Sequence, residues 1–445
     1  MKEKIIELIR NKNLKELKKL LFEANEADIS ECFDDLSEED IAIVYKCLSK
    51  DQAADVFAYL EPDVQETIVK TLTDKELASL INEQFPDDIA DLLEEMPANL
   101  VKRILATTEP EKRKVVNELL QYPEDSAGSI MNVEYIDLKE NMTIKEALSK
   151  IRRQGKDKET VYYFYVTDNR RRLVGVVTVR DLLLAEEDKT IKDVMEENVI
   201  SINTHTDKEE VAQMFDKYDF LVMPVVDKEN KLIGVVTIDD AMDVMSDESE
   251  EDFEKMAAMA PSDDSYLKMS VFSLFKNRIV WLLFLMLSAT FTGMIITRYE
   301  TAFEAVPILV SFIPMVMDTG GNCGSQASTM IIRGLATDEI ELRDIFKVWF
   351  KEIRVALLCG ITLAIVNGVR IMIMYGSEFT LAIVVGLTIV FTAVIAKSLG
   401  CLLPMAAKKI GVDPAYMASP MITTIVDACS ILIYFNVACM LMSIV

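Results

Sequence analysis

Five long apolar segments after residue 278 constrain the fold of this chain more than any other feature. A helix needs about 20 residues to cross a bilayer, and each segment approaches or exceeds that length with no more than one charged residue inside it. The expected spans are residues 279–297, 305–332, 355–375, 379–407 and 414–445. The sequence therefore predicts a multi-domain membrane protein whose C-terminal part is a five-helix α transmembrane domain.

The part of the chain that precedes these spans is strongly acidic. Residues 1–270 carry 35 basic and 62 acidic side chains, whereas residues 271–445 carry 12 and 11. A surface of that charge repels nucleic acid and attracts cations, so no nucleic-acid partner is expected. Residues 1–21 place apolar side chains at helical spacing among charges, which predicts a soluble amphipathic helix and not a signal peptide.

The basic residues that flank the spans predict the orientation in the membrane. Ten lie on the side of the N-terminal half, and two lie on the other side. The ten are Lys268, Lys276, Arg278, Arg333, Arg343, Lys347, Lys351, Arg354, Lys408 and Lys409, and the two are Arg298 and Arg370. Because cytoplasmic loops are enriched in lysine and arginine, the N-terminus is predicted to be cytoplasmic and the C-terminus outside.

Two carboxylates lie inside the predicted spans. Placing an aspartate near the middle of a bilayer costs about 2.5–3.5 kcal/mol, so Asp318 and Asp427 should face protein, water or an ion. Thr423 and Thr424 precede Asp427 by four and three residues and share its helix face, and Asn322 follows Asp318 by one turn. These hard donors suit magnesium, which is held through few carboxylates and retained waters. A structural contact between helices and a proton relay are the alternatives.

An internal repeat marks the middle of the chain. LVGVVTVRDLL at 173–183 returns as LIGVVTIDDAM at 232–242, each within the order helix, strand, turn, strand, helix. This resembles a pair of α/β cystathionine-β-synthase-type (CBS) domains. In that family a Thr-x-x-Asp motif can contact the phosphate and ribose of an adenine nucleotide, and here it reads Thr178 to Asp181 and Thr237 to Asp240. A plain strand-to-helix cap is the alternative.

The helical pattern of residues 1–127 is punctuated by prolines. ADVFAYLEP at 54–62 is echoed by ADLLEEMP at 90–97, which predicts an all-α superhelical N-domain.

A run of nine carboxylates without a base, at 239–254, joins the CBS pair to the first span. Repulsion among these carboxylates would destabilise a helix unless cations bind between them, and a solvated linker is the alternative. Because of its position, its conformation can be passed to the membrane part.

The whole chain resembles the MgtE family of magnesium channels. The most specific segments are MDTGGNCGSQASTMIIRGLA at 317–336 and DPAYMASPMITTIVDACSILIYF at 413–435. The resemblance implies an N-domain at 1–127, CBS domains at 128–188 and 189–246, a connecting (plug) helix at 247–276 and the pore domain at 277–445.

The resemblance also implies a homodimer in the lipid bilayer of a bacterial inner (plasma) membrane, with one pore lined by the second and fifth spans. By this resemblance, Asp427 is the residue that selects hydrated magnesium. Asp413 is expected to be bridged to the connecting helix through a magnesium ion. The regulatory carboxylates that it implies are Asp91, Glu209, Asp219, Asp240, Asp243, Glu248 and Glu251. Magnesium is then both substrate and regulatory ligand, and ATP or another adenine nucleotide is the second ligand implied.

The predicted function is a magnesium-selective channel for uptake that cytoplasmic magnesium closes. A proton- or sodium-coupled carrier of divalent cations is the alternative, with Asp318 or Asp427 binding the proton. An enzyme is not expected, because the spans contain no histidine and neither an HExxH nor a GxSxG motif.

Overall fold

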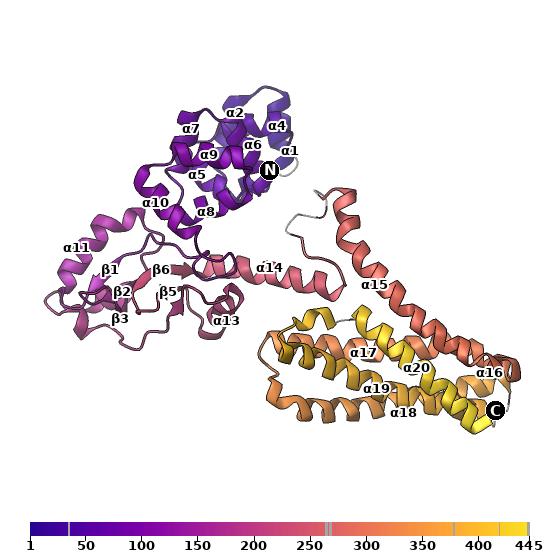
Figure 1. Ribbon diagram of the computed structural model, residues 1–445. Coiled ribbons are helices and arrows are strands. Elements are labelled where there is room, and N and C mark those ends of the chain that lie inside the picture. The colour runs from indigo at the N-terminus through magenta and orange to yellow at the C-terminus, as the bar shows by residue number, and fades with distance from the viewer. Residues whose placement is uncertain (34–35, 263–265, 267–268, 377–378, 418, 443–445) are drawn as a thin grey trace. The chain divides into compact units, whose positions relative to one another are not determined.

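The chain forms two compact units, Met1–Met245 and Ser246–Val445. The computed structural model describes residues 1–33, 36–262, 266, 269–376, 379–417 and 419–442 (Figure 1). Lys268 and residues 263–265 and 267 of the expected connecting helix lie outside the described residues.

The first unit begins with a succession of short helices. In the described part of residues 1–120 these are α1 (Lys2–Arg10), α2 (Leu14–Phe22), α3 (Glu26–Ser30), α4 (Glu38–Tyr45), α5 (Lys50–Ala58), α6 (Pro62–Thr71), α7 (Asp74–Ile81), α8 (Pro86–Glu95), α9 (Ala98–Thr107) and α10 (Pro110–Leu119). Side-chain caps such as Ser37 and Thr73, or a proline in the first turn, fix where these helices begin. Helices pack on the next but one, with α5 on α7, α7 on α9 and α8 on α10. The predicted superhelical N-domain is confirmed. Residues 1–21, predicted as one amphipathic helix, form two helices instead, because Lys12 adopts a positive φ and Asn13 caps the start of α2.

Two three-stranded sheets follow, and they repeat each other. The first contains β1 (Asp137–Lys139), β2 (Tyr163–Thr167) and β3 (Leu173–Thr178), and the second β4 (Ile202–Asn203), β5 (Val222–Val226) and β6 (Leu232–Thr237). In each, the first pair of strands is parallel and the second pair antiparallel. The helices are α11 (Ile144–Gln154), α12 (Val179–Leu184), α13 (Lys208–Tyr218) and α14 (Ile238–Met256), with short 3-10 turns at Gly155–Asp157 and Ile191–Asp193. The predicted CBS pair is confirmed.

The N-domain and the second CBS domain share one hydrophobic core. Ile89 and Leu93 of α8 belong to the same buried cluster as Val211 and Phe215 of α13 and Met223 of β5. This packing brings the acidic start of α8 close to the end of β6, where α14 begins.

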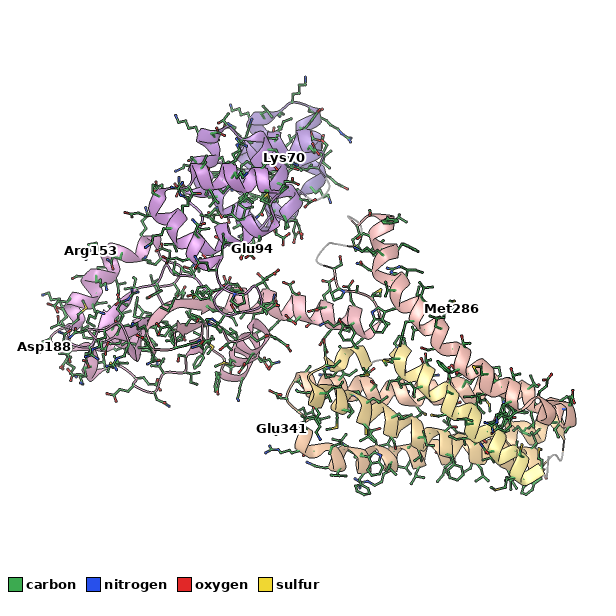
Figure 2. All side chains as sticks on the ribbon, viewed as in Figure 1. Lys70, Glu94, Arg153, Asp188, Met286 and Glu341 are labelled. Atoms are coloured by element: carbon green, nitrogen blue, oxygen red, sulfur yellow. The ribbon has the colours of Figure 1, made fainter. Side chains whose placement is uncertain are left out.

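The second unit contains long helices that are suited to a membrane (Figure 1). The described elements are α15 (Val271–Arg298), α16 (Glu300–Ala305), α17 (Ile313–Ala336), α18 (Ile345–Tyr375), α19 (Phe379–Ile410) and α20 (Ser419–Met442), with 3-10 turns at Pro307–Phe312, Leu342–Asp344 and Pro414–Met417. In the described residues, α15, α18, α19 and α20 are apolar and long enough to cross a bilayer. Their outer surfaces are apolar too, and Met286 on α15 is one example (Figure 2).

The fifth long helix, α17, is less apolar than the other four, because it carries glycines and polar side chains. It packs between α19 and α20, and its buried face consists largely of small residues such as Gly320, Gly324 and Ala327. The predicted α-helical membrane domain is therefore confirmed. Four of its five expected spans are apolar and long enough to cross a bilayer in the described residues, and α17 packs on α19 and α20 with one face.

Candidate functional site

The two aspartates of the spans lie on neighbouring helices. Ser325 Oγ is 2.7 Å from Ser419 Oγ, and a Cβ on Gly321 would lie 3.0 Å from Thr423 Cγ2. These contacts run in opposite directions along α17 and α20, so the helices are antiparallel. Continuing the same register places Asp318 of α17 level with Asp427 of α20.

The threonines before Asp427 are held by the first turn of their helix. The hydroxyls of Thr423 and Thr424 each donate to the carbonyl oxygen of Pro420, at 2.9 Å. Their lone pairs therefore remain available as acceptors. Asp427 is half-buried, whereas Asp318 is exposed.

One face of α17 is polar and exposed. Asp318, Asn322, Gln326 and Thr329 follow one another at helical spacing, and all four side chains are exposed in the single chain. We refer to these four residues as the polar stripe of α17. In a membrane helix such a stripe must face water or another protein surface.

The connecting helix predicted at 247–276 does not extend over that range: α14 ends at Met256, and the next helix, α15, begins at Val271. The last turn of α14 carries an ammonium group between two carboxylates. Lys255 Nζ lies 2.7 Å from Glu251 Oε1, one turn earlier on α14, and 2.8 Å from Asp413 Oδ2, just before α20. Partial burial disfavours the charged amine, but the two carboxylates outweigh it and raise the pKa of Lys255. Lys255 also lies over the ring of Tyr416, which stacks on Trp281 of α15. Lys255 thus links Glu251 to Asp413, and the ring of Tyr416 extends this contact to α15.

A second group of carboxylates gathers where the N-domain meets the CBS pair. We call it the acidic cluster: Asp87, Asp88 and Asp91 of α8, Glu159 of the first CBS domain, and Asp239 and Asp240 at the start of α14. Asp87 is buried, and among the described residues its Oδ1 atom has no hydrogen-bond partner. A buried carboxylate oxygen without a donor is costly, and a positive charge beside it would offset that cost.

The pKa values of the acidic cluster reflect this crowding. Withdrawal from water, then repulsion by neighbouring carboxylates, raises the pKa of Asp91 and of Glu159 to about 7. Burial, then the charge of Asp239, raises the pKa of Asp240 to about 6, although Thr237 opposes the shift. Burial likewise raises the pKa of Asp87 well above its ordinary value. In the described residues, however, no three such side chains are close enough to form a ready-made metal site.

The remaining predicted regulatory residues are distributed along two helices. Asp243 and Glu248 lie on α14 between the acidic cluster and Lys255, and Asp243 is exposed. Glu209 lies in the first turn of α13 and Asp219 caps its other end, about 15 Å away at 1.5 Å per residue. Within one chain, a single ion cannot contact both of these residues.

Each Thr-x-x-Asp motif forms a strand-to-helix cap. The hydroxyl of Thr178 donates to the Asp181 carboxylate, and the amide of Asp181 donates back at 3.2 Å. Thr237 Oγ1 donates to Asp240 Oδ2 at 2.6 Å in the second copy. The capping interpretation is therefore observed, and Asp240 also belongs to the acidic cluster.

The sequence prediction did not single out Asp87, Asp88, Glu159 or Lys255. Adjacent aspartates in the first turn of α8 are also what a helix N-terminus favours, so they gave no separate signal. Glu159 follows α11 in a polar segment without a motif. Lys255 comes directly after the acidic run, and only the fold shows that it faces Asp413.

Comparison with known proteins agrees with this architecture. Residues 24–125 match the MgtE intracellular N domain, residues 127–188 and 191–247 match CBS domains, and residues 313–437 match the MgtE divalent cation transporter family. The chain is 39% identical to the magnesium transporter MgtE of Thermus thermophilus over 80% of its own length and 79% of that protein. It is 35% identical to the Bacillus subtilis magnesium transporter MgtE, over the same shares of both chains.

Solved structures match the first unit. The cytosolic domain of the Mg2+ channel MgtE, in complex with ATP, is 37% identical, with a TM-score of 0.53, and the match covers 55% of this chain and all of that one. The soluble part of a magnesium transporter gives 32% identity and a TM-score of 0.51, over 56% of this chain and 98% of that one.

A helical N-domain and a CBS pair, joined to long apolar helices with carboxylates at their centre, define a membrane transporter of the CBS-containing class. Within that class, the chain belongs to the MgtE family of magnesium transporters.

Proposed function

We propose that this chain transports magnesium across the membrane as a selective channel, and that cytoplasmic magnesium closes it. The observation that carries the proposal is the register of α17 and α20, which sets Asp318 level with Asp427 inside a bundle of apolar helices. The relatives named above are magnesium transporters, which supports the choice of ion.

The chemistry of this pair suits a hydrated ion. Magnesium gives up its water reluctantly, and the waters that it retains are hydrogen-bond donors. Asp427 and the lone pairs of Thr423 and Thr424 are acceptors on one helix face, and Asn322 adds an amide oxygen from α17. The selection of magnesium over other ions then depends on hydrogen bonds from its retained waters as much as on its charge.

The polar stripe of α17 supports a homodimer. Asp318 and Asn322 are exposed on a single chain, although they lie on a helix in the middle of the membrane domain. A second copy that faces this stripe would enclose a water-filled path with carboxylates from both chains. In this arrangement the N-terminus is cytoplasmic and the C-terminus is outside, in the plasma membrane.

The acidic cluster supplies the proposed sensor. Its carboxylates repel one another when they are ionised, and a divalent cation between α8 and α14 would remove that repulsion and stabilise the packed arrangement of the N-domain on the CBS pair. Asp243, Glu248 and Glu251 continue the negative charge along α14 toward Asp413. Asp413 and Glu251 share a lysine here, and magnesium is the alternative cation for the same pair.

ATP is the second regulatory ligand in this proposal. One similar cytosolic domain has been solved with ATP bound, and the Thr178–Asp181 and Thr237–Asp240 caps have the donor and acceptor groups that a ribose and a phosphate need. Their present hydrogen bonds would have to be shared with the nucleotide.

Flux measurements in proteoliposomes test the proposal directly. With a membrane potential but no pH gradient, we expect magnesium uptake that stops as magnesium rises on the face of the soluble unit. Uptake that required a proton or sodium gradient would instead favour a coupled carrier. Absence of magnesium flux under every internal concentration would refute the transport function itself.

A further inference from the structure

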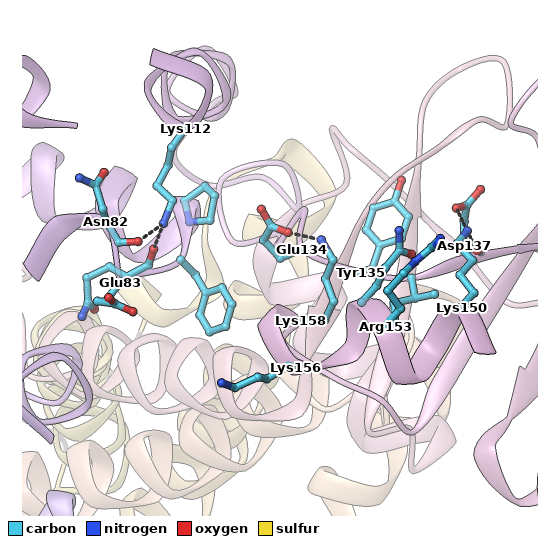
Figure 3. Close-up of a pocket in the computed structure, with 15 residues that line it drawn as sticks. Asn82, Glu83, Lys112, Glu134, Tyr135, Asp137, Lys150, Arg153, Lys156 and Lys158 are labelled. Atoms are coloured by element: carbon cyan, nitrogen blue, oxygen red, sulfur yellow. Dashed lines mark hydrogen bonds and ion pairs between the residues drawn. The ribbon is translucent and has the colours of Figure 1, made fainter. Parts of the chain in front are cut away.

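A hollow of about 770 Å³ opens between the N-domain and the first CBS domain (Figure 3). One wall is the segment 82–86 between α7 and α8, together with Lys112 of α10. The other wall is the segment 134–137 that leads into β1, with the last turn of α11 and the residues after it. Neither Thr-x-x-Asp cap lines this hollow, so it is separate from the proposed nucleotide site.

The hollow is basic, although it belongs to the most acidic part of the chain. Five cationic side chains line it: Lys112, Lys150, Arg153, Lys156 and Lys158. Three carboxylates also line it, and each has its own lysine: Glu83 pairs with Lys50, Glu134 with Lys158, and Asp137 with Lys150. The acidic side chains of the walls are therefore already neutralised.

Among the side chains that the structure describes, three of these five cations have no carboxylate partner within ion-pair distance. Lys112 Nζ is held at the wall by the carbonyl oxygens of Asn82 and Gln84, at 2.9 and 2.6 Å. Arg153 and Lys156 are exposed, and neither makes an ion pair with any side chain in the described part of the chain. Lys156 extends from its segment toward the N-domain wall (Figure 3).

Two cations without a carboxylate partner in the described residues and a third held at the wall line one cavity, and this is the recognition chemistry of a multivalent oxyanion. A guanidinium presents a planar fork to two oxygens of a phosphate, and ammonium groups bind the remaining oxygens as point charges. The volume exceeds that of a single phosphate group. A nucleic acid is disfavoured, because the net charge of residues 1–270 would repel its backbone.

We propose that this pocket binds the polyphosphate group of a small metabolite and thereby fastens the N-domain to the first CBS domain. Arg153 and Lys156 come from the CBS side, and Lys112 comes from the N-domain side, so the same anion contacts both walls. The assignment does not depend on which ion the membrane domain carries.

Calorimetry on the full-length protein in detergent tests the site, with pyrophosphate as the probe. The buffer must be free of magnesium, because pyrophosphate chelates that ion. The double variant Arg153→Ala/Lys156→Ala should bind at least tenfold more weakly. The matched control is Arg152→Ala/Lys228→Ala, which removes the same charge from exposed positions outside the pocket and should bind within about twofold of the parent, as long-range screening at ordinary salt allows.

Two probes distinguish the sources of the phosphate. If the ligand is a nucleotide, ATP should still bind to Thr178→Ala/Asp181→Ala and should lose that residual binding when Arg153 and Lys156 are also replaced. If the ligand is an inorganic polyphosphate, pyrophosphate but not ATP should compete for the pocket. Adenosine, which lacks phosphate, should displace neither.

Lysine labelling of the unmodified protein gives an independent readout should the double variant fail to fold. Pyrophosphate should slow the acetylation of Lys156, measured by mass spectrometry, and leave that of Lys228 unchanged. Equal labelling of both lysines with and without pyrophosphate, or equal affinity of the double variant and its control, would overturn the proposal.

Discussion

The Lys255 ammonium lies 2.8 Å from the Asp413 carboxylate, which joins the acidic end of α14 to the segment just before α20. Glu251 binds the same ammonium from the other side, at 2.7 Å. The same concentration of negative charge affects Asp252, because burial and then the charge of Asp413 raise the pKa of its carboxyl group. Lys255 thus supplies the positive charge that lets a strongly acidic helix end beside another carboxylate.

Removing this charge should loosen the junction in the absence of magnesium. In Lys255→Met, Glu251 and Asp413 repel each other, so we expect exposed Phe253 to be cleaved by chymotrypsin severalfold faster without magnesium than in the parent. Added magnesium should restore most of the protection. Lys255→Arg keeps the charge and is the control. Equal cleavage of parent and Met variant without magnesium would contradict the role of Lys255.

Asp427 should be essential for flux but not for folding. Asp427→Asn keeps the size of the side chain and removes the charge that attracts a hydrated cation, so magnesium uptake into proteoliposomes should fall at least tenfold. Asp338→Asn removes a carboxylate from an exposed loop and is the matched control. A normal flux in Asp427→Asn, with the protein correctly inserted, would exclude Asp427 from the ion path.

The acidic cluster makes the stability of the first unit depend on pH. In the folded protein the pKa is about 7 for Asp91 and Glu159 and about 6 for Asp240. In an unfolded chain, carboxyl groups have a pKa of about 4. The folded state therefore binds more protons in this window. Without magnesium, the free energy of unfolding should fall as the pH rises from about 4 to about 7 and level off above that.

We expect a total fall of roughly 1–3 kcal/mol, which is less than three separate shifts would give. The groups are coupled, and Asp91, although other carboxylates and protein atoms crowd it, keeps part of its surface in contact with water. Hydrogen exchange of α8, corrected for intrinsic rates, measures it. Magnesium should stabilise α8 more at about pH 8 than at about pH 5, because ionised carboxylates bind the ion. Asp87→Asn/Asp91→Asn should flatten the pH profile. Stability that rises with pH in the parent would disprove the assignment.

Close packing of α17 on α19 should not tolerate an added methyl group. A Cβ on Gly400 would lie 2.4 Å from the carbonyl oxygen of Gly324, whereas a Cβ on Gly368 of α18 would meet nothing within 4 Å. Gly400→Ala should therefore cost about 1–3 kcal/mol, read as a lower melting temperature in detergent, and Gly368→Ala should not. Equal melting temperatures for the two variants would mean that α17 and α19 can move apart at no cost.

The buried ion pair between α18 and α19 should couple strongly. Lys397 Nζ lies 3.4 Å from Glu352 Oε2, and both side chains are shielded from solvent. Lys397→Met leaves a buried carboxylate without its partner and should cost about 3–5 kcal/mol of stability. The double variant Lys397→Met/Glu352→Gln should regain most of that loss. Additive effects in the double-mutant cycle would show that the pair contributes nothing beyond its separate side chains.

The sequence by itself determined the architecture, because each part has a local and periodic signal. The returning strand pattern before Thr178 and Thr237 predicts the CBS pair, and the long apolar segments predict membrane helices. Asp318 and Asp427 could also be predicted as site residues from the local sequence, because a charged residue within an apolar segment is unusual whatever its neighbours in space are.

Only the tertiary structure decided which charges meet. Asp87 and Glu159 are far apart along the chain, and no periodicity links them, yet packing of the N-domain on the CBS pair brings both toward Asp240. The register of α17 against α20 and the position of Lys255 between Glu251 and Asp413 were likewise beyond the sequence. Local sequence patterns determine which secondary structure each segment favours. Electrostatic contacts between segments that are distant in sequence depend on distances that exist only after the core has formed.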